Sequence, residues 1–194
     1  MNGRKFDPRK LRKLNDPERL KDIPPDYIRS KLQAKEPDVL VEIGAGTAFF
    51  CIAFLDQLMP SIVYACDVSD TMLTWIEENV TPKYPNIIPL KTNEHSVPLD
   101  DGVADLVFMI NLHHELDDPP LTVLEAHRLL KTGGEIFIVD WKKKEMTEGP
   151  PVNIRCLPET VRDQLRGAGF TDVKMFDDLP KHFLVVAKKS ALRT

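Results

Sequence analysis

Short apolar runs alternate with longer, helix-length segments along most of the chain. Continuous runs of Val, Ile, Leu and Phe indicate strands that are covered on both faces, as in a parallel sheet. We expect such strands at residues 38–43, 61–66, 86–90, 103–110 and 135–139. Helices are expected at residues 47–58, from Ser69 or Asp70 to residue 80, at 121–130 before Gly133-Gly134, and at 159–167, with a loop at 91–102.

The C-terminal part of the pattern departs from this alternation. Two further apolar runs, at residues 171–176 and 182–187, are separated by only five residues. A crossover between parallel neighbours needs a dozen or more residues, so the last strand must run antiparallel to its neighbour. The pattern therefore predicts a doubly wound α/β fold that ends with an antiparallel strand.

Residues with useful chemistry follow the ends of the predicted strands. In open α/β sheets, ligands bind at the carboxyl ends of the strands, so residues at those ends share one rim of the sheet. The strand-end residues are Glu42 to Gly46, Asp67, Asn93 with Glu94, Asn111 to Glu115, and Asp140 with Trp141. The sequence therefore predicts one ligand site on that rim.

A glycine turn and an acidic residue indicate the kind of ligand. Gly44-Ala45-Gly46 presents backbone amides at the start of a helix, where a Cβ would block a ligand. Asp67, 23 positions beyond Gly44, is placed to accept hydrogen bonds from a ribose diol, so we expect a nucleoside-bearing cofactor. Phe49 stands where the dinucleotide fingerprint needs a small residue, which opposes NAD and FAD. No Gly-Lys-Ser/Thr follows the turn, as a phosphate-binding loop would require.

Four segments of the chain resemble motifs of a known family. They are VLVEIGAGTAFF (39–50), YACDVSDTML (64–73), PLDDGVADLVFM (98–109) and LLKTGGEIFIVD (129–140). They resemble motifs of class I S-adenosylmethionine-dependent methyltransferases, most nearly the ubiquinone/menaquinone-biosynthesis type. The resemblance covers residues 39–188. It implies a Rossmann-like seven-stranded sheet of order 3-2-1-4-5-7-6 with strand 7 antiparallel. It also implies S-adenosylmethionine as methyl donor and S-adenosylhomocysteine as product.

Two positions depart from the family pattern. Ala48 replaces the third glycine of the first motif, and Asn93 replaces the Asp that usually hydrogen-bonds the adenine amino group. The Asn93 side-chain oxygen can still accept that bond. Because of these departures, the alternative to an enzyme is a non-catalytic cofactor-binding or protein-interaction module on the same fold.

The resemblance also implies which residues contact the cofactor. They are Glu42, Gly44, Ala45 and Gly46 at the methionine moiety, Asp67 at the ribose hydroxyls, Val68 and Met72 beside the adenine, Asn93 and Glu94 at its amino edge, and Asn111 and Leu112 beneath the sulfonium. Met72 is equally consistent with simple core packing.

Methyl transfer is an in-line displacement, so a base is required only if the acceptor is a hydroxyl or an acidic carbon. By position the candidate bases are His113, His114, Glu115 and Asp140, and an inert structural role for the two histidines is equally open. On an extended backbone, His113 and Glu115 would share one face and His114 the other. No third His or Cys stands at a recognisable spacing, so no metal site is expected.

Length and charge set the domain organisation. A chain of 194 residues, 42% hydrophobic and 29% charged, fits one globular domain. Residues 1–35 carry 11 Lys or Arg and five Asp or Glu. We expect a basic helical segment at 1–37, a methyltransferase domain at 38–188 and a tail at 189–194. A basic stripe of this kind is more often a solvated helix face than a binding arm, so nucleic acid is not favoured as a partner.

The remaining expectations concern location and acceptor. The longest apolar run, residues 48–55, is too short to span a membrane, and no apolar region follows the basic start as in a secretory signal. We expect a cytoplasmic monomer or homodimer with Cys51 and Cys66 reduced in the core. The acceptor is expected to be a small molecule. Lys142-Lys143-Lys144 would favour an anionic one, unless this run is merely solvated.

Overall fold

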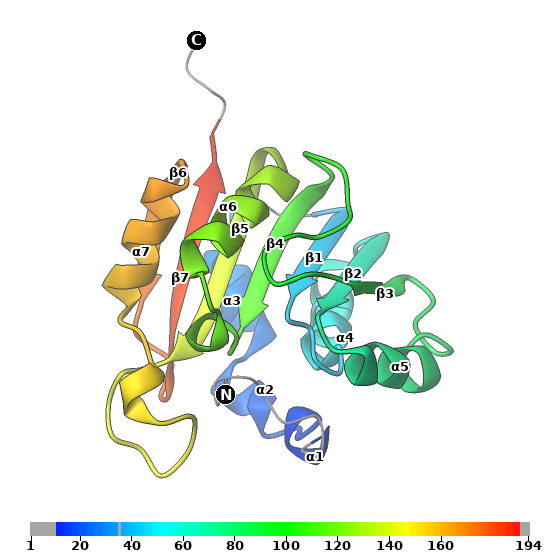
Figure 1. Ribbon diagram of the computed structural model, residues 1–194, viewed down its shortest axis with the longest axis horizontal. Coiled ribbons are helices and arrows are strands. Elements are labelled where there is room, and N and C mark those ends of the chain that lie inside the picture. Colours follow the sequence, from blue (N-terminus) through cyan, green and yellow to red (C-terminus); the bar gives the residue numbers. More distant parts are fainter. Residues whose placement is uncertain (1–10, 35, 191–194) are drawn as a thin grey trace.

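A seven-stranded mixed sheet organises the computed structural model, which describes residues 11–34 and 36–190 (Figure 1). The strand order is β3-β2-β1-β4-β5-β7-β6. The strands are β1 (Val39–Ile43), β2 (Ile62–Asp67), β3 (Ile87–Lys91), β4 (Ala104–Ile110), β5 (Leu130–Trp141), β6 (Phe170–Phe176) and β7 (His182–Lys189). β7 runs antiparallel to both β5 and β6, and the other pairs are parallel. The predicted fold class and the order implied by the resemblance are both confirmed.

Helices cover both faces of this sheet (Figure 1). They are α1 (Leu11–Leu14), α2 (Arg19–Asp22), α3 (Pro25–Lys31), α4 (Phe49–Leu58), α5 (Asp70–Asn79), α6 (Pro119–Leu129) and α7 (Pro158–Gly167), with 3-10 turns η2 (His113–Glu115) and η3 (Val152–Ile154). Buried apolar side chains of α3 and α4, with Ile76 of α5, belong to one apolar cluster, and those of α6 and α7 belong to the other. The sheet is therefore covered on both sides, as its continuous apolar runs predict.

The two clusters are supplied by alternating residues of each strand. In β1, Leu40 belongs to the cluster under α4 and Val41 to the cluster under α6. The first cluster is centred on three buried rings, Phe54, Phe108 and Phe137, whose centroids lie 4.9 to 5.2 Å apart. Rings at these spacings fill the space between α4 and the central strands and make this the rigid part of the fold.

The sequence predicts that Gly133-Gly134 ends a helix, and this prediction is wrong. Helix α6 ends at Leu129, and both glycines lie inside β5, which begins at Leu130. The pairing of β4 with β5 jumps from Ala104 opposite Leu130 to Leu106 opposite Glu135, so the glycine stretch forms an irregularity in the strand. Gly133 has φ +85°, a backbone conformation that glycine adopts without strain. At the other end of the domain, Lys189 belongs to β7 rather than to the expected tail.

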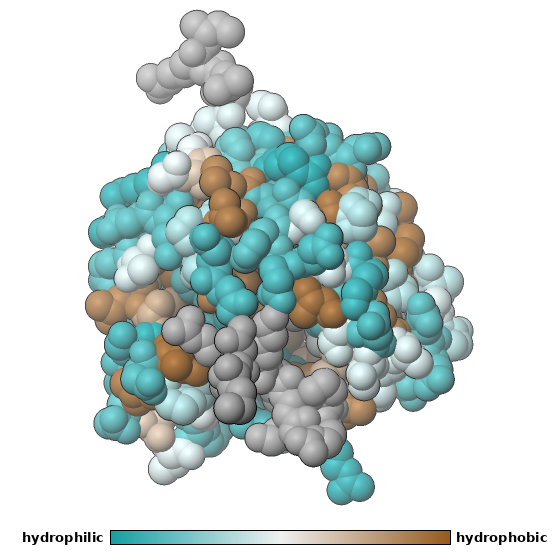
Figure 2. Space-filling model, viewed as in Figure 1, coloured by the Kyte–Doolittle hydropathy of each residue, from teal (hydrophilic) through white to brown (hydrophobic). Residues whose placement is uncertain are grey.

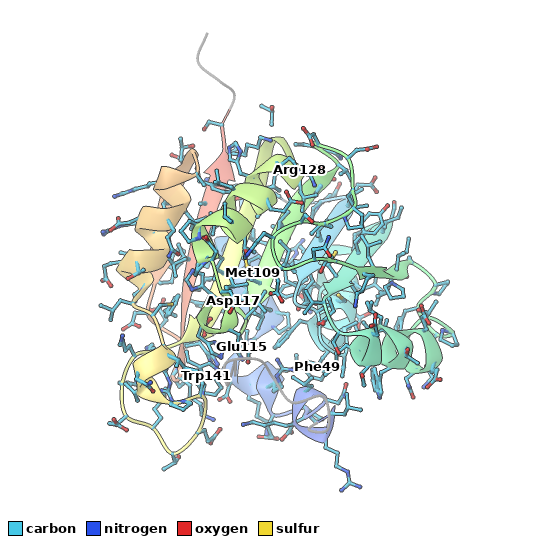
Figure 3. All side chains as sticks on the ribbon, in the orientation of Figure 1. Phe49, Met109, Glu115, Asp117, Arg128 and Trp141 are labelled. Carbon is cyan, nitrogen blue, oxygen red and sulfur yellow. The ribbon has the colours of Figure 1, made fainter. Side chains whose placement is uncertain are left out.

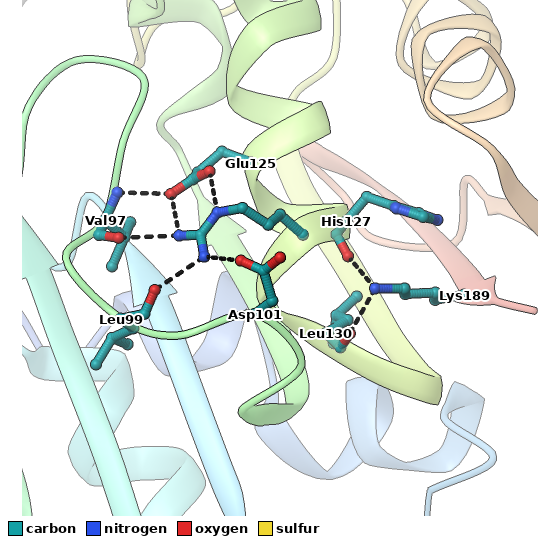
Figure 4. Close-up of polar contacts among 8 residues, drawn as sticks. Val97, Leu99, Asp101, Glu125, His127, Leu130 and Lys189 are labelled. Atoms are coloured by element: carbon teal, nitrogen blue, oxygen red, sulfur yellow. Dashed lines mark hydrogen bonds and ion pairs between the residues drawn. The ribbon is translucent and has the colours of Figure 1, made fainter.

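An arginine on α6 holds the long connection between β3 and β4, which is a loop as predicted. The Arg128 guanidinium donates to the carbonyl oxygens of Val97 and Leu99 at 3.0 and 2.8 Å. It also bonds the carboxylates of Asp101 and Glu125 at 2.6 and 2.7 Å (Figure 4). The Glu125 carboxylate in turn accepts from the Val97 amide at 2.7 Å. Side-chain hydrogen bonds therefore take the place of a helix in ordering this loop.

The segment before β1 contains the three short helices α1, α2 and α3, joined by turns, and residues 1–10 of it lie outside the described residues. Ile23, Ile28 and Leu32 are buried in the cluster that also holds α4. The Gln33 amide donates to the Glu135 carboxylate at 2.9 Å. This segment is therefore packed onto the domain at the start of β1.

The surface is mixed in character. Figure 2 shows hydrophilic side chains over much of the viewed face, with apolar groups in small separate patches. Over the part of the chain that the structure describes, every helix is too short or too polar to cross a membrane.

Candidate functional site

A cavity of about 1080 Å³ lies at the carboxyl ends of the parallel strands. Figure 3 shows Phe49, Glu115 and Trp141, from α4, η2 and β5, along the edge of the sheet that faces α1 and α2. All the residues that the resemblance assigns to cofactor binding line this cavity. They are Glu42, Gly44, Ala45, Gly46, Asp67, Val68, Met72, Asn93, Glu94, Asn111 and Leu112. The predicted convergence of the strand ends on one rim is therefore present in the structure.

The turn between β1 and α4 is built from left-handed backbone positions. Gly44 has φ +74° and Gly46 has φ +56°, and a Cβ on Gly44 would lie 2.6 Å from the Leu112 side chain. Only glycine fits the first position without displacing that neighbour. Ala48, where the family has its third glycine, is buried and also left-handed, with φ 57°. That conformation costs an L-residue roughly 1–2 kcal/mol, and it delays the start of α4 to Phe49 rather than the expected residue 47.

Asp67 links the turn to the end of β2. One carboxylate oxygen accepts from the Gly46 amide and the other from the Ser69 amide, each at 2.8 Å. Burial raises the pKa of Asp67, and these amide hydrogen bonds oppose the rise. Each carboxylate oxygen can accept more than one hydrogen bond. Asp67 is thus fixed in place with capacity left for a ligand's hydroxyl groups.

Glu42 is a buried carboxyl group at the end of β1. The Cys51 thiol donates to its Oε2 at 2.8 Å. Burial raises the pKa of Glu42 to about 8, against the opposing effects of the Cys51 hydrogen bond and the Arg19 charge. The Arg19 guanidinium lies 4.7 Å from the centre of the Phe50 ring. Cys51 and Cys66 are buried and unpaired by disulfide, as expected.

Near the glycine turn and the end of β4, two polar atoms have no hydrogen-bond partner among the described residues. They are the buried Asn111 Oδ1 and the buried Thr47 Oγ1. Asn111 follows β4, has φ 57° and lines the cavity. Because a buried polar atom without a partner costs about 1–3 kcal/mol, the Asn111 amide is suited to a bound polar group.

The residues after Asn111 form a 3-10 turn, and this changes which side chains face the cavity. His114 and Glu115 line the cavity. His113 points toward α7, where its Nε2 lies 2.7 Å from Gln164 Oε1 and its Nδ1 lies 3.3 Å from Cys156 Sγ. The expectation that His113 and Glu115 share one face is wrong, because it assumed an extended backbone.

His114 and Asp140 form a buried pair at the wall of the cavity. His114 Nδ1 lies 2.8 Å from Asp140 Oδ1, and the His114 amide donates to Asp140 Oδ2 at 3.0 Å. Burial by itself lowers the pKa of His114, but the hydrogen bonds and charges of Asp140 and Glu115 outweigh it and raise that pKa to about 9. Burial by itself raises the pKa of Asp140, and the bond from His114 reverses this and holds the pKa below its usual value. At neutral pH the pair is therefore an imidazolium held by a carboxylate.

The lysine run at 142–144 does not line the cavity. Lys142 forms an ion pair with Asp177 at 2.9 Å, and Lys144 donates to the Pro180 carbonyl oxygen at 3.2 Å. Lys181 lines the cavity instead, and its ammonium group pairs with Asp22 at 2.9 Å and with Glu148 at 3.0 Å. The run therefore binds the connection between β6 and β7 and gives no support to an anionic acceptor.

Sequence reasoning missed His182, which lines the cavity from the start of β7. Its side chain is buried, and it lies opposite Trp141 in the pairing of β5 with β7. The sequence could have predicted this position, because an antiparallel strand begins at the rim where its parallel neighbours end. The predicted orientation of the last strand thus places its first residue at the site.

Comparisons with known proteins bear on this geometry. A family model described as a methyltransferase domain matches residues 41–138. A crystal structure of a SAM-dependent methyltransferase from Aquifex aeolicus superimposes with a TM-score of 0.87 and 31% sequence identity. The match covers 95% of this chain and 100% of that one. The chain belongs to the S-adenosylmethionine-dependent methyltransferases.

Curated relatives of this methyltransferase are more distant. The malonyl-[acyl-carrier protein] O-methyltransferase of Geobacter sulfurreducens is 24% identical over 159 residues, which are 74% of this chain and 59% of that protein. An uncharacterized methyltransferase-like protein of Schizosaccharomyces pombe is 27% identical over 122 residues, which are 63% of this chain and 45% of that protein. The chain thus spans about half the length of the curated relatives that it matches.

The cofactor of the family is S-adenosylmethionine, and the residues present fit it. The glycine turn leaves room that a Cβ would fill, Asp67 offers acceptors for hydroxyl groups, and Asn111 offers an unpartnered amide oxygen. Glu42 is a buried acid that would gain from a cationic group of the ligand. The described residues contain no group of three or more His, Cys, Asp or Glu that could hold a metal ion.

Proposed function

We propose that this methyltransferase transfers the methyl group of S-adenosylmethionine to a small, uncharged acceptor inside the rim cavity. The observation that carries the proposal is the size and lining of that cavity. Pockets for small ligands typically hold about 300 to 1,000 Å³, and this cavity, at about 1080 Å³, lies at the upper end of that range and extends from the glycine turn after β1 to His182 at the start of β7. It therefore supplies space for a cofactor against β1, β2 and β4 and for a second molecule toward β5 and β7.

The cofactor's place in the proposal follows from the side chains on each wall. Glu42 and the amides of the glycine turn bind the methionine end, and Asp67 binds the ribose hydroxyls. Val68 and Met72 pack beside the adenine, and Asn93 with Glu94 binds its amino edge. Asn111 and Leu112 lie beneath the reacting end. Their common position on the cavity wall supports these roles.

S-adenosylmethionine supplies an electrophilic methyl group when it is bound. The protein's part is to exclude water and to hold the acceptor in line with that group. His114 is already protonated at neutral pH, because the Asp140 and Glu115 carboxylates raise its pKa to about 9 despite its burial. His114 therefore donates a hydrogen bond rather than accepting a proton. His113 faces Gln164 and does not act on the acceptor. We propose that neither His113 nor His114 acts as a base in the transfer at neutral pH.

Calorimetry with S-adenosylmethionine and S-adenosylhomocysteine tests the binding part of the proposal. Asp67→Ala is expected to weaken the binding of both ligands by at least about tenfold. The substitution removes hydrogen bonds to a charged group, which contribute about 1.5–3 kcal/mol. Asp70→Ala is the matched control, because Asp70 is also acidic and near the same helix start but pairs with Lys91 on the exposed surface. Absence of binding by the wild-type protein would refute the proposed function.

Labelled methyl donor tests the transfer itself. Wild-type protein is incubated with the donor and a metabolite extract, and the labelled species is then identified. A general base typically contributes 10²- to 10⁴-fold, so His114→Gln is expected to retain label transfer within about tenfold at pH 7. A loss of two orders of magnitude or more would show that His114 acts as a base.

Several finer expectations stay predictions. The likeness to the ubiquinone/menaquinone type is one of them, and the cytoplasmic location and the monomeric or dimeric state are others. The acceptor class is best sought with uncharged compounds first, because Lys142 and Lys144 are bound to the connection between β6 and β7.

A further inference from the structure

His182 is a buried imidazole without a hydrogen-bond partner at the wall of the cavity. Its side chain is 1% exposed, and neither Nδ1 nor Nε2 has a partner among the described residues. A neutral imidazole offers one donor and one acceptor, so both would be left unsatisfied in a water-excluded place. Leaving such groups unpaired costs about 1–3 kcal/mol each, which is unusual for a residue with only a packing role.

The charged groups around His182 balance one another. Asp140 and Asp22 favour its protonated form, while Lys181 and Arg19 disfavour it. Burial is the largest effect and lowers the pKa of His182 to about 4, so the ring is neutral at physiological pH. A neutral ring in a balanced field offers little attraction to either an anion or a cation, and burying a charge beside it is costly.

The cavity wall near His182 has a charged part and an apolar part. In the charged part, Lys181 pairs with Asp22 and Glu148, so these charges offset one another. The Trp141 ring lies 4.3 Å from the imidazole, centroid to centroid, and lines the cavity with Ile23, Pro150 and Pro151. Gly149 packs so closely on Trp141 that a Cβ there would lie 2.7 Å from the indole. The wall therefore combines one neutral hydrogen-bonding group with an apolar and aromatic surround. Such a wall fits an apolar or aromatic ligand that carries one uncharged hydrogen-bonding group.

We propose that His182 and Trp141 form the acceptor subsite, and that it takes an apolar, preferably aromatic, molecule bearing one uncharged O–H or N–H group that hydrogen-bonds to His182. This inference rests on the proposed methyl-transfer function and adds a substrate class to it. The Trp141 ring lies against the imidazole, whose nitrogens are buried, so in this proposal the indole moves aside when such a group approaches. Because the bond forms away from water, it discriminates strongly against analogues that lack the polar group.

A series of one-ring probes tests the inference while the natural acceptor is unidentified. Phenol carries a neutral hydroxyl, toluene carries none, benzoate is an anion and benzylamine is a cation. Each is titrated into protein saturated with S-adenosylhomocysteine and labelled with ¹³C at histidine Cε1. The His182 signal is assigned by its loss in His182→Gln. We expect phenol to shift this signal and to bind about threefold to tenfold more tightly than toluene, benzoate or benzylamine.

Two variants of His182 separate hydrogen bonding from packing. His182→Phe keeps a ring and is expected to bind phenol and toluene equally. His182→Gln keeps a donor and an acceptor and is expected to retain the preference for phenol, measured by ligand-observed NMR. Thermal melting confirms that each variant folds, and if His182→Phe does not fold, the wild-type and Gln comparison decides alone.

Three results would overturn the inference: equal binding of phenol and toluene to the wild type, a preference that survives in His182→Phe, or no binding of phenol at its solubility limit. Calorimetry of S-adenosylhomocysteine on the same samples keeps the two proposals apart. Loss of that binding contradicts the proposed function, whereas intact binding with a failed probe series contradicts only the acceptor subsite.

Discussion

The buried pair of His114 and Asp140 should make the stability of this protein fall as the pH rises above neutrality. Contacts with Asp140 and Glu115 outweigh the effect of burial and raise the pKa of His114 from 6.5 to about 9 in the folded state. Each tenfold change in proton affinity is worth about 1.4 kcal/mol, so the folded state gains about 3 kcal/mol when His114 is protonated. This is a large share of the 5–15 kcal/mol that typically separates folded from unfolded proteins.

The sign follows from the direction of the shift. A group whose pKa is raised on folding contributes fully below its unfolded pKa and loses that contribution as the pH rises through the folded value. For His114 the loss should run from about pH 6.5 to about pH 9. The pKa of Asp140 is lowered despite its burial, chiefly by the hydrogen bond from His114. Its contribution is therefore present above its unfolded pKa and is lost only in acid.

Asp140→Asn tests this reasoning. The amide has the size of the carboxylate and can still accept from the His114 ring, but it removes the charge. We expect urea denaturation to show a loss about 3 kcal/mol larger at pH 6 than at pH 9. A loss that does not depend on pH adds to this, because the amide NH2 takes the place of the oxygen that accepts from the His114 backbone amide. The part of the wild-type decline that comes from His114 should disappear, while the part from Glu42, whose pKa burial raises to about 8, should remain. The control is His113→Gln, because burial lowers the pKa of His113 and its contribution changes only in acid.

The result that would refute the reasoning is equally specific. A ¹³C titration that places the His114 midpoint at or below 6.5 would show that the carboxylates do not hold the proton. Parallel stability curves for wild type and Asp140→Asn between pH 6 and 9 would show that the pair does not cause the decline.

Three further predictions test the fold and the cofactor turn. Arg128→Met should lower the free energy of unfolding, measured in urea, by about 1–3 kcal/mol, since two loop carbonyls lose their donor. Arg162→Met should leave it unchanged because, among the described residues, the half-buried Arg162 pairs only with the exposed Asp163. Phe137→Ala should lower the free energy of unfolding, measured by thermal melting, by about 3–5 kcal/mol. A smaller loss would mean that the neighbouring rings close the space left by the Phe137 side chain. Gly44→Ala should weaken S-adenosylmethionine at least about tenfold by calorimetry. Gly133→Ala is the control and should leave this binding unchanged. Gly133 also has a left-handed backbone, but a Cβ there would meet nothing within 4 Å.

Element type and order could be read from the sequence because each depends on local pattern. Continuous apolar runs identified the parallel strands, and the five-residue connection before the last strand fixed its direction. Gly133-Gly134 misled because glycine has two common uses, as a helix stop and as an irregularity in a strand. Only the pairing of β4 with β5 distinguishes them, and that pairing depends on residues 26 positions apart in the sequence, Ala104 and Leu130.

The residues of the site also divide into those that the sequence predicts and those that it does not. The cofactor wall lies on consecutive strand ends, so position along the chain placed Glu42, Asp67 and Asn111 on the cavity. The directions of the His113 and His114 side chains depend on the 3-10 turn η2, which the hydrophobic pattern of the sequence did not predict. The partners of Lys142 were equally hidden, because a lysine run looks the same whether it faces a cavity or an acidic loop.

The charges in the cavity suit a reaction that consumes a positive charge. Methyl transfer discharges a sulfonium, so carboxylates that stabilise the cationic donor alone would deepen the ground state and slow the reaction. Here the acids are largely neutralised before any ligand binds. Burial raises the pKa of Glu42 to about 8, and Glu115 and Asp140 both lie against His114. Asp67 is not neutralised in this way, but its oxygens already accept from backbone amides at the ribose end of the proposed site. The negative charge facing the reacting atoms is thus reduced, because the His114 imidazolium offsets one of the two carboxylates beside it and burial favours the neutral form of Glu42. That supports transfer to an uncharged acceptor by positioning and water exclusion rather than by charge.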